Sequence, residues 1–300
     1  MLRKIRNLTL FGLGCLLLAA LLLVGVYLPY ARAYGLVHPA RTSPGGTPAD
    51  VGIAHYEELR LTTADGLKLA AWYIPPKNGA VVICIHGLGV NRGQFLEEAA
   101  FLHRKGFGVL LLDLRNHGAS EGTKTTFGLD EARDVAAAVA FIRQREGPTM
   151  PIAAFGHSLG AVTAILAAVQ MPEIRAVIAV SPFASLESNI NEGVRVLTGL
   201  DPRYFAPQIL FFGQLQAGVE ISTVRPVEVI GKLSPRPVLL IHGAKDDLLP
   251  ARNSLELYAA AGEPKELVIY PGVGHGGFIF QEPKLYPKKV GAFLEKYLLP

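Results

Sequence analysis

The chain of 300 residues carries a formal charge of +4, and half of its residues are hydrophobic while only 18% are charged. This balance excludes an intrinsically disordered chain, which combines low hydrophobicity with many charges. The first 49 residues hold five basic and no acidic residues, and subtracting those five leaves a charge of −1 for residues 50–300. The sequence therefore gives no reason to expect a nucleic-acid partner, because the globular part has no basic excess.

The first predicted element is an apolar run of 21 residues without a charge, at residues 8–28. As a helix it would span roughly 30 Å, the thickness of the hydrocarbon core of a bilayer. Arg3, Lys4 and Arg6 precede the run, and this bias favours a cytoplasmic N-terminus with the rest of the chain exported. We therefore predict a membrane anchor within residues 1–33, in a single-pass protein of the cell membrane whose catalytic domain lies on the exported side.

A cleaved signal sequence is the alternative for this segment. Ala31, Arg32 and Ala33 resemble the small-x-small site of a signal peptidase, and cleavage after them would give a secreted protein. The apolar run is long for a signal peptide, whose apolar region has about 7–15 residues. Residues 34–53 follow, and their Pro and Gly residues favour a linker.

From residue 54 the sequence alternates short strands with helices. Two strands joined by an Asp-Gly turn come first, and the later short apolar runs are typical of strands buried on both faces of a parallel sheet. The predicted strands are 56–62, 67–74, 80–85, 107–112, 152–155, 176–180, 238–241 and 267–270. The predicted helices are 94–105, 129–146, 159–170, 251–261 and 283–297. The pattern predicts an α/β domain over residues 54–300 with a mostly parallel, doubly wound sheet.

One stretch, at about residues 183–233, interrupts this alternation without a clear buried strand. A connection of this length favours an inserted helical cap over a loop. The cap holds six large apolar side chains within nine residues, which are Tyr204, Phe205, Ile209, Leu210, Phe211 and Phe212. They are expected either to pack the cap on the core or to form a wall for an acyl chain. Phe211 and Phe212 are the candidates for substrate contact.

The sequence Gly-His-Ser-Leu-Gly at residues 156–160 is the first candidate for chemistry. It follows a predicted buried strand and opens a predicted helix, the setting in which the serine of a G-x-S-x-G motif acts as a nucleophile. Gly156 and Gly160 keep bulk away from the tight turn. Ser158 is therefore expected to stand exposed above the edge of the sheet.

A serine hydroxyl needs a base to activate it, and the base needs a carboxylate to hold it. His275 follows the last predicted strand, and Asp246 follows the strand before it. These positions lie after the carboxyl ends of strands, where open α/β sheets place their sites. We predict a catalytic triad of Ser158, His275 and Asp246. Asp247 is the less favoured acid, expected to be exposed or to cap the helix that follows.

Two backbone amides are predicted to form an oxyanion hole. The amide of Leu88, in the loop after a buried strand, can act together with the amide of Leu159, which follows the nucleophile. The same loop does not complete the dinucleotide motif G-x-G-x-x-G, because position 92 is Arg. The eight His residues lack metal-ligand spacing, so neither a cofactor nor a metal is expected.

Taken together, residues 54–300 resemble the α/β-hydrolase superfamily. The segments IHGLGVNRG at 85–93 and DLRNHGASEG at 113–122 are similar to its bacterial serine aminopeptidase-like, monoacylglycerol-lipase-like and BEM46-like branches. The segment RPVLLIHGAKDDLLP at 236–250 resembles the strand and loop that carry the family's acid. The resemblance implies the α/β-hydrolase fold, a cap between strands six and seven, and serine hydrolase chemistry on esters, thioesters or peptides. The segment 113–122 is better explained as a structural loop beneath the site.

The combined prediction is a serine hydrolase that cleaves a carboxylic ester, such as an acylglycerol or another lipid-like ester, through an acyl-enzyme. A serine peptidase, an aminopeptidase or an acyltransferase would use the same triad. A membrane-tethered binding protein on an inactive fold is the alternative from another class, and the joint presence of Ser158, Asp246 and His275 argues against it. The expected partners are a small ester or lipid-like substrate and, through residues 8–28, the membrane. The sequence does not define the oligomeric state.

Overall fold

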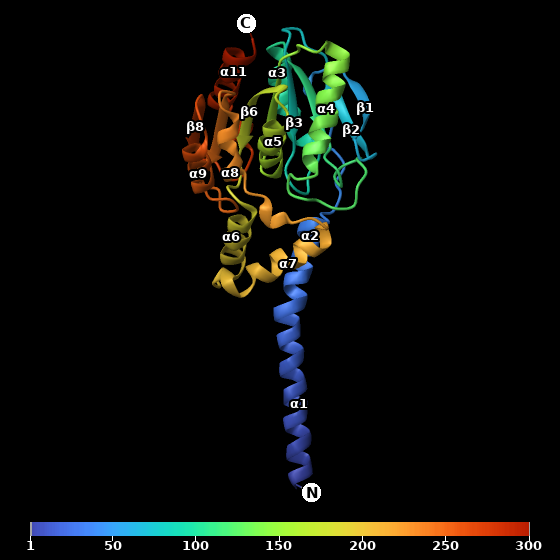
Figure 1. Cartoon of the computed structure of the whole chain (residues 1–300), viewed down its shortest axis with the longest axis vertical. Coiled ribbons are helices and arrows are strands. Elements are labelled where there is room, and N and C mark those ends of the chain that lie inside the picture. Colours follow the sequence, from blue (N-terminus) through green and yellow to red (C-terminus); the bar gives the residue numbers. More distant parts are fainter. Residues whose placement is uncertain (1, 300) are drawn as a thin grey trace.

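The structure is a computed structural model that describes residues 2–299. Its centre is an eight-stranded sheet in the order β1-β2-β4-β3-β5-β6-β7-β8 (Figure 1). Strand β2 pairs antiparallel with β1 and β4, and all other neighbours are parallel. The predicted α/β class and mostly parallel sheet are confirmed. The strands are β1 (Glu57–Thr62), β2 (Lys68–Ile74), β3 (Val81–Ile85), β4 (Gly108–Leu112), β5 (Ile152–His157), β6 (Ile174–Val180), β7 (Val238–Gly243) and β8 (Lys265–Tyr270).

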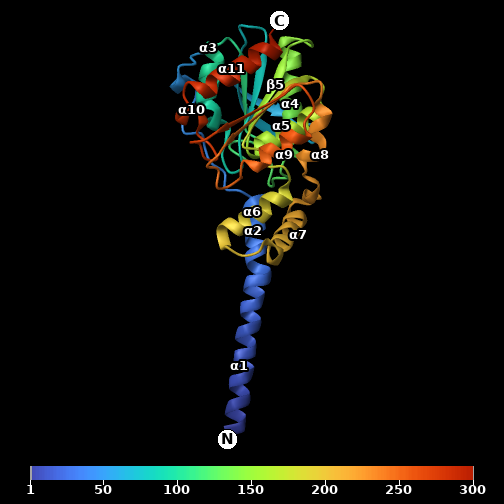
Figure 2. The ribbon, with the colours of Figure 1, turned by 90° about the vertical axis from the view of Figure 1, so that its left-hand side faces the viewer.

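Helices cover both faces of the sheet, because successive side chains of each strand point into two different cores. In β3, Val81 and Ile83 belong to one core, whereas Val82 and Cys84 belong to the other. The first core contains α4 (Glu131–Glu146), α5 (Leu159–Gln170) and α9 (Arg252–Ala260). The second contains α3 (Leu96–Arg104) and α11 (Leu285–Leu298), which are labelled at the upper left of the domain in Figure 2, with α4, α5 and α9 further right. Short elements are η2 (Pro48–Val51), η3 (Arg92–Phe95) and α10 (Phe278–Gln281).

The insertion between β6 and β7 folds as a helical cap. Its elements are α6 (Leu186–Thr198), η4 (Pro202–Tyr204), α7 (Ala206–Ala217), η5 (Ile221–Thr223), α8 (Pro226–Val229) and η6 (Ile230–Leu233). Helix α6 begins after Ser185, whose side chain accepts a hydrogen bond from the amide of Ser188, and it ends at Gly199 in a left-handed conformation. The helices α6 and α7 lie at the end of the domain from which α1 projects (Figures 1 and 2).

The N-terminal helix extends beyond the predicted anchor. It runs without a break through α1 (Leu2–Leu22), the π-helical turn η1 (Leu23–Tyr27) and α2 (Leu28–Val37). By length and composition it is the one helix among residues 2–299 that could cross a membrane. Residues 3–22 are exposed, whereas Pro29, Ala33 and Val37 of α2 are buried at four-residue spacing, which places them on one face of the helix. Helix α2 packs against α7 of the cap.

A linker was predicted at residues 34–53, but the first four of these residues belong to α2, which continues to Val37. Residues 38–47 form no helix or strand before η2, and the segment contacts the domain, where His38 Nδ1 is 2.6 Å from the carbonyl oxygen of Thr123. The Pro and Gly residues indicated a lack of regular structure. They gave no sign that the segment packs on the domain.

Candidate active site

Ser158 lies in the turn between β5 and α5. Its backbone has φ 55° and ψ −116°, a strained conformation for a residue that carries a side chain. Both flanking glycines are required, since a Cβ on Gly156 would lie 2.0 Å from the carbonyl oxygen of Gly160, and a Cβ on Gly160 would lie 2.0 Å from that of Ile85. The turn presents the half-buried Ser158 side chain at the N-terminus of α5.

Asp246 and His275 are brought together by the loops that follow β7 and β8. His275 Nδ1 lies 2.8 Å from Asp246 Oδ2. The Asp246 side chain is fully buried, and its Oδ1 accepts hydrogen bonds from the amides of Leu248 and Leu249 at 3.0 and 2.7 Å. Asp247 is exposed, and α9 begins without a side-chain cap. The geometry therefore favours Asp246 over Asp247 as the partner of His275.

A second histidine, His242, also contacts Asp246, and the sequence pattern does not point to it. The buried His242 Nε2 lies 3.1 Å from Asp246 Oδ2 and 2.7 Å from the carbonyl oxygen of Leu249, so Nε2 carries a proton. Its Nδ1 accepts a hydrogen bond from Ser254 Oγ at 2.7 Å. Burial alone would raise the pKa of Asp246, but hydrogen bonds from His242 and His275 hold it below its usual range. Asp246 thus stays ionised beside the His275 ring.

A chain of hydrogen bonds joins the three loops of the site. The amide of Gly87 donates to Gln94 Oε1 at 2.8 Å, and Gln94 Nε2 donates to His157 Nδ1 at 3.0 Å. His157 Nε2 then donates to the carbonyl oxygen of His275 at 2.7 Å. Burial lowers the pKa of His157 to about 4, so near pH 7 its ring is neutral, with one donor and one acceptor nitrogen. Gln94 and His157 are therefore positioning residues, although His157 is only a variable position of the serine motif.

The His157 ring also connects the candidate nucleophile with the candidate base. Its centroid is 4.9 Å from that of the His275 ring, and Ser158 is the next residue along the chain. Among the described residues, no hydrogen bond joins Ser158 Oγ to His275. Catalytic hydrogen bonds are often long in the absence of substrate and tighten in the reacting complex.

The amides of Leu88 and Leu159 have the properties expected of oxyanion donors. Both residues line the same cavity as Ser158. Within residues 2–299 neither amide donates a hydrogen bond, whereas the neighbouring amides of Gly87 and Ser158 do. Unpaired N–H groups beside a serine at a helix N-terminus can stabilise a developing negative charge.

Ser158 opens into a cavity of about 870 Å³. This volume lies within the roughly 300–1,000 Å³ that is typical of small-molecule sites. The lining is largely apolar and includes Phe183 after β6 and Phe205 and Ile209 of the cap. Among the described residues, Arg32 is the single charged side chain in the lining, and no carboxylate contributes to it.

Phe211 and Phe212, the predicted substrate contacts, do not line this cavity. Phe212 packs instead on Tyr30 of α2, with ring centroids 5.6 Å apart, and Phe211 is 64% exposed. Phe205 and Ile209, from the same apolar cluster, line the cavity instead. The sequence could not separate these roles, because it did not reveal α2 as a packing partner of α7.

The segment 113–122 supports the site and does not line the cavity. The amide of Leu114 donates to His86 Nε2 at 3.0 Å, which ties this segment to the loop that holds Leu88. Asn116 Nδ2 donates to the carbonyl oxygen of Val37 at 3.2 Å, which ties it to the end of α2. The explanation of this segment as a structural loop is the one that the contacts favour.

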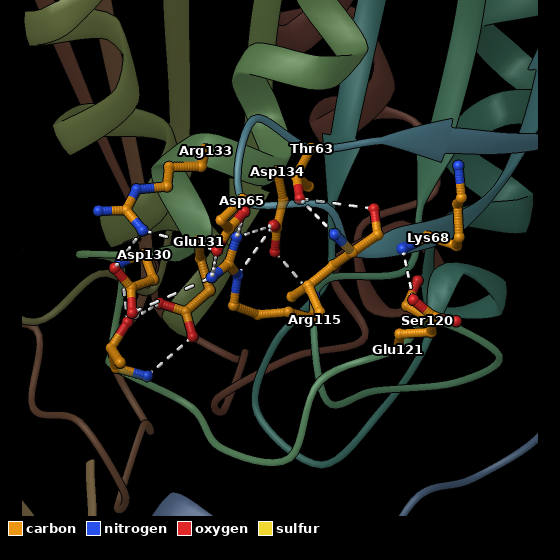
Figure 3. A network of polar contacts seen from close by, with 12 residues as sticks. Thr63, Asp65, Lys68, Arg115, Ser120, Glu121, Asp130, Glu131, Arg133 and Asp134 are labelled. Carbon is orange, nitrogen blue, oxygen red and sulfur yellow. Dashed lines mark hydrogen bonds and ion pairs between the residues drawn. The ribbon is translucent and has the colours of Figure 1, made fainter. Parts of the chain in front are cut away.

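Arg115 fixes the segment through a buried network of ion pairs (Figure 3). Its guanidinium donates to Asp134 Oδ1 at 2.8 Å and to Asp65 Oδ2 at 2.9 Å. The Asp134 side chain is fully buried and that of Arg115 is 5% exposed. The guanidinium holds the pKa of Asp65 below its usual range. Arg133 joins the network from its rim, 3.5 Å from Asp65, with its side chain 55% exposed.

We expect Arg115→Met to lower the free energy of unfolding by about 3–5 kcal/mol, because it leaves the Asp134 carboxylate buried without a cation. The measurement is thermal unfolding of the full chain in detergent at pH 8, where the midpoint should fall by roughly 10 °C. Arg133→Met is the matched control, since an exposed ion pair contributes at most about 1 kcal/mol. Equal shifts for the two variants would contradict the importance of the buried pair.

The chain is similar to several known proteins. A family model described as "Serine aminopeptidase, S33" matches residues 76–217. An uncharacterized protein of Mycobacterium tuberculosis, Rv2307c, is 35% identical over 223 residues, which cover 73% of this chain and 72% of that protein. The uncharacterized protein YqkD of Bacillus subtilis is 30% identical over 239 residues, which cover 78% of each chain.

Solved structures extend the comparison. The esterase Pf2001 of Pyrococcus furiosus superimposes with a TM-score of 0.74 at 26% identity, covering 88% of this chain and 98% of that chain. The acylaminoacyl peptidase of Pyrococcus horikoshii superimposes with a TM-score of 0.64 at 20% identity, covering 82% of this chain and 42% of that chain. The second likeness, at this identity, concerns the fold alone.

Proposed function

The chain belongs to the α/β-hydrolase superfamily, and we propose that it is a membrane-anchored serine hydrolase that cleaves carboxylic esters with apolar acyl groups. The observation that carries the proposal is the 2.8 Å contact between His275 Nδ1 and Asp246 Oδ2, beside a strained Ser158 in the wall of an apolar cavity. The esterase Pf2001, similar over most of the chain, supports the same reaction class.

The proposed reaction begins with a proton transfer. The ionised Asp246 holds the proton of His275 on Nδ1, which leaves Nε2 free to accept the proton of Ser158 Oγ. The serine oxygen bonds to the ester carbonyl carbon, and the resulting oxyanion accepts hydrogen bonds from the amides of Leu88 and Leu159. His275 returns the proton to the alkoxy oxygen as the C–O bond breaks, and an alcohol leaves.

Water completes the cycle. His275 takes a proton from a water molecule, whose oxygen bonds to the carbonyl carbon of the acyl-enzyme. The bond to Ser158 Oγ then breaks, the serine recovers its proton, and a carboxylic acid is released. An acyltransferase would differ only in an alcohol acceptor in place of water.

An aminopeptidase is the second candidate, because the matching family model bears that name. An aminopeptidase has to hold the ammonium group of its substrate, which a carboxylate does best. The described lining of this cavity has no carboxylate and one cation, Arg32. This lining favours an uncharged acyl group over a peptide N-terminus.

A substrate panel tests the proposal. The full chain in detergent is assayed with acyl esters of increasing chain length, monoacylglycerols and aminoacyl amides, and its active serine is titrated with a fluorophosphonate probe. We expect labelling, and ester turnover well above amide turnover. Labelling with amide turnover above ester turnover would assign the site to a peptidase, and no labelling would reject the serine mechanism.

An uncleaved anchor is proposed over a cleaved signal. The alternative cleavage site follows Ala33, which is 1% exposed and lies inside α2, between the buried Pro29 and Val37. Cleavage there would cut a helix of the folded domain and remove Tyr30, the partner of Phe212. Helix α2 is therefore expected to remain part of the mature protein, with the basic N-terminus on the cytoplasmic side.

We expect the mature protein to retain residues 1–33 and to stay with membranes after washing with high salt. Mass spectrometry of the purified protein, together with extraction by salt and by detergent, measures both properties. A mature chain that begins at Tyr34 and leaves the membrane in salt would establish the cleaved signal instead.

A further inference from the structure

The face of the N-terminal helix next to its packing stripe lines the candidate active-site cavity, and Pro29 of that stripe belongs to both. Val24, Leu28, Arg32 and Leu36 all belong to the cavity lining. They recur every four residues, so they form one stripe along the helix. Ser158 belongs to the same lining. The proposed anchor is thus continuous with one wall of the substrate site.

One end of the cavity lies beside the part of the helix where the apolar run ends. Val24 and Leu28 are the last stripe residues of the uncharged run 8–28, and Arg32 is the first charge after it. In a helix that spans a bilayer, this change from apolar to charged residues marks the boundary between hydrocarbon and headgroups. The end of the cavity at Val24 therefore lies at the level of the hydrocarbon.

The opposite wall at this end is also apolar and open. Leu197 of α6 and Leu200 line the cavity and are 65% and 50% exposed, and Val24 and Leu28 are 43% and 50% exposed. Residues that line a cavity and are also exposed mark its mouth. An apolar mouth is unfavourable in water but suits contact with lipid chains.

The outer surface of the cap continues this apolar character. Tyr204, Phe211 and Leu215 are exposed on the cap, and α7 lies against α2, at the end of the domain from which α1 projects (Figures 1 and 2). Aromatic and aliphatic side chains beside a membrane-spanning helix are typical of a surface at the membrane interface. Contact with the membrane interface would account for the exposure of Phe211, which does not line the cavity.

We propose that the substrate is an acyl ester lipid that remains in the bilayer, and that its acyl chain reaches Ser158 along the Val24–Leu36 face of the N-terminal helix. The inference rests on the proposed serine hydrolase function. Arg32 lies where a lipid headgroup would meet the cavity. Ala40 and Leu248 also line the cavity and are exposed, so we expect water to reach the acyl-enzyme past them.

Reconstituted protein tests this source of substrate. The full chain is placed in vesicles of an ether-linked phosphatidylcholine, which contains no acyl ester. 4-Methylumbelliferyl oleate is added either to these vesicles or, in the same amount, to separate vesicles without protein, and the water-soluble 4-methylumbelliferyl acetate is the reference. We expect oleate in the shared bilayer to be cleaved at least about tenfold faster than oleate in separate vesicles. Equal rates would indicate a water-borne substrate and overturn the inference.

Each of two walls of the cavity contains a glycine, and a large side chain at either position should block the proposed path of the acyl chain. Gly35 on α2 and Gly193 on α6 line the cavity, and a Cβ on either would meet no atom within 4 Å. We expect Gly35→Phe, and independently Gly193→Phe, to lower the ratio of oleate to acetate turnover by at least about tenfold. Gly14→Phe is the control, because Gly14 is equally open but lies on α1 outside the cavity lining. An unchanged ratio in both cavity variants would overturn the inference.

Failure of the proposed function and failure of the proposed membrane route give different results. Absence of fluorophosphonate labelling and of turnover of both esters in the unsubstituted protein would reject the serine hydrolase function. Labelling and acetate turnover without an advantage for oleate in the shared bilayer would reject only the route from the membrane.

Discussion

Ser158→Ala is expected to reduce ester turnover by about 10⁴-fold or more, because the hydroxyl that forms the acyl-enzyme is removed. Labelling by a fluorophosphonate probe should disappear at the same time. The measurement is steady-state turnover of a soluble ester by the full chain in detergent, with labelling read by mass spectrometry. The small side chain of Ala fits the turn at φ 55° no worse than Ser, so folding should be retained.

Ser222→Ala is the matched control, since Ser222 lies in η5 and outside the cavity lining. Its turnover and labelling should equal those of the unsubstituted protein. Near-normal turnover in Ser158→Ala would reject the proposed mechanism, whatever the control shows.

Asp246→Asn is expected to lower the turnover number by about 10⁴-fold. An Asn side chain can offer its NH₂ group to His275 Nδ1, which then accepts a hydrogen bond and leaves the proton on Nε2. In that tautomer the ring cannot take a proton from Ser158. The amides of Leu248 and Leu249 can still donate to the Asn oxygen, and His242 Nε2 keeps its bond to the carbonyl oxygen of Leu249, so the fold of the loop should be retained.

Asp247→Asn is the control for the acid, because the neighbouring carboxylate is exposed and has no contact with His275 among the described residues. Its turnover should stay within about twofold of the unsubstituted protein. The opposite ranking of the two variants would move the triad by one position and contradict the role of the 2.8 Å contact.

The order of the elements could be read from the sequence because it depends on local signals. Apolar runs of strand length alternate with helical stretches, and Ser158, Asp246 and His275 each follow such a run. The carboxyl ends of parallel strands meet at one edge of the sheet, so residues far apart in the chain could be placed together without any knowledge of their side-chain contacts.

The supporting residues could not be predicted in the same way. Gln94 and His157 act through a chain of hydrogen bonds between three loops, and His242 acts through the buried side of Asp246. These pairings depend on tertiary packing, which leaves no periodic pattern in the sequence. Phe211 was a misplaced candidate for the same reason: helix α7 is apolar on several sides, and only its neighbours decide which side faces the cavity.

The unbroken helix from α1 to α2 gives the length of the membrane segment an importance that a flexible tether would not have. Each residue of an α-helix adds about 1.5 Å and turns the next by about 100°. A single residue inserted in η1 would therefore rotate Val24 about 100° away from Leu28 and out of the cavity lining. Four inserted residues, close to one turn, would bring it back to within roughly 40°. Changes of length here are compatible with the site only in steps of whole helical turns, so the phase of the anchor is coupled to the shape of the substrate site.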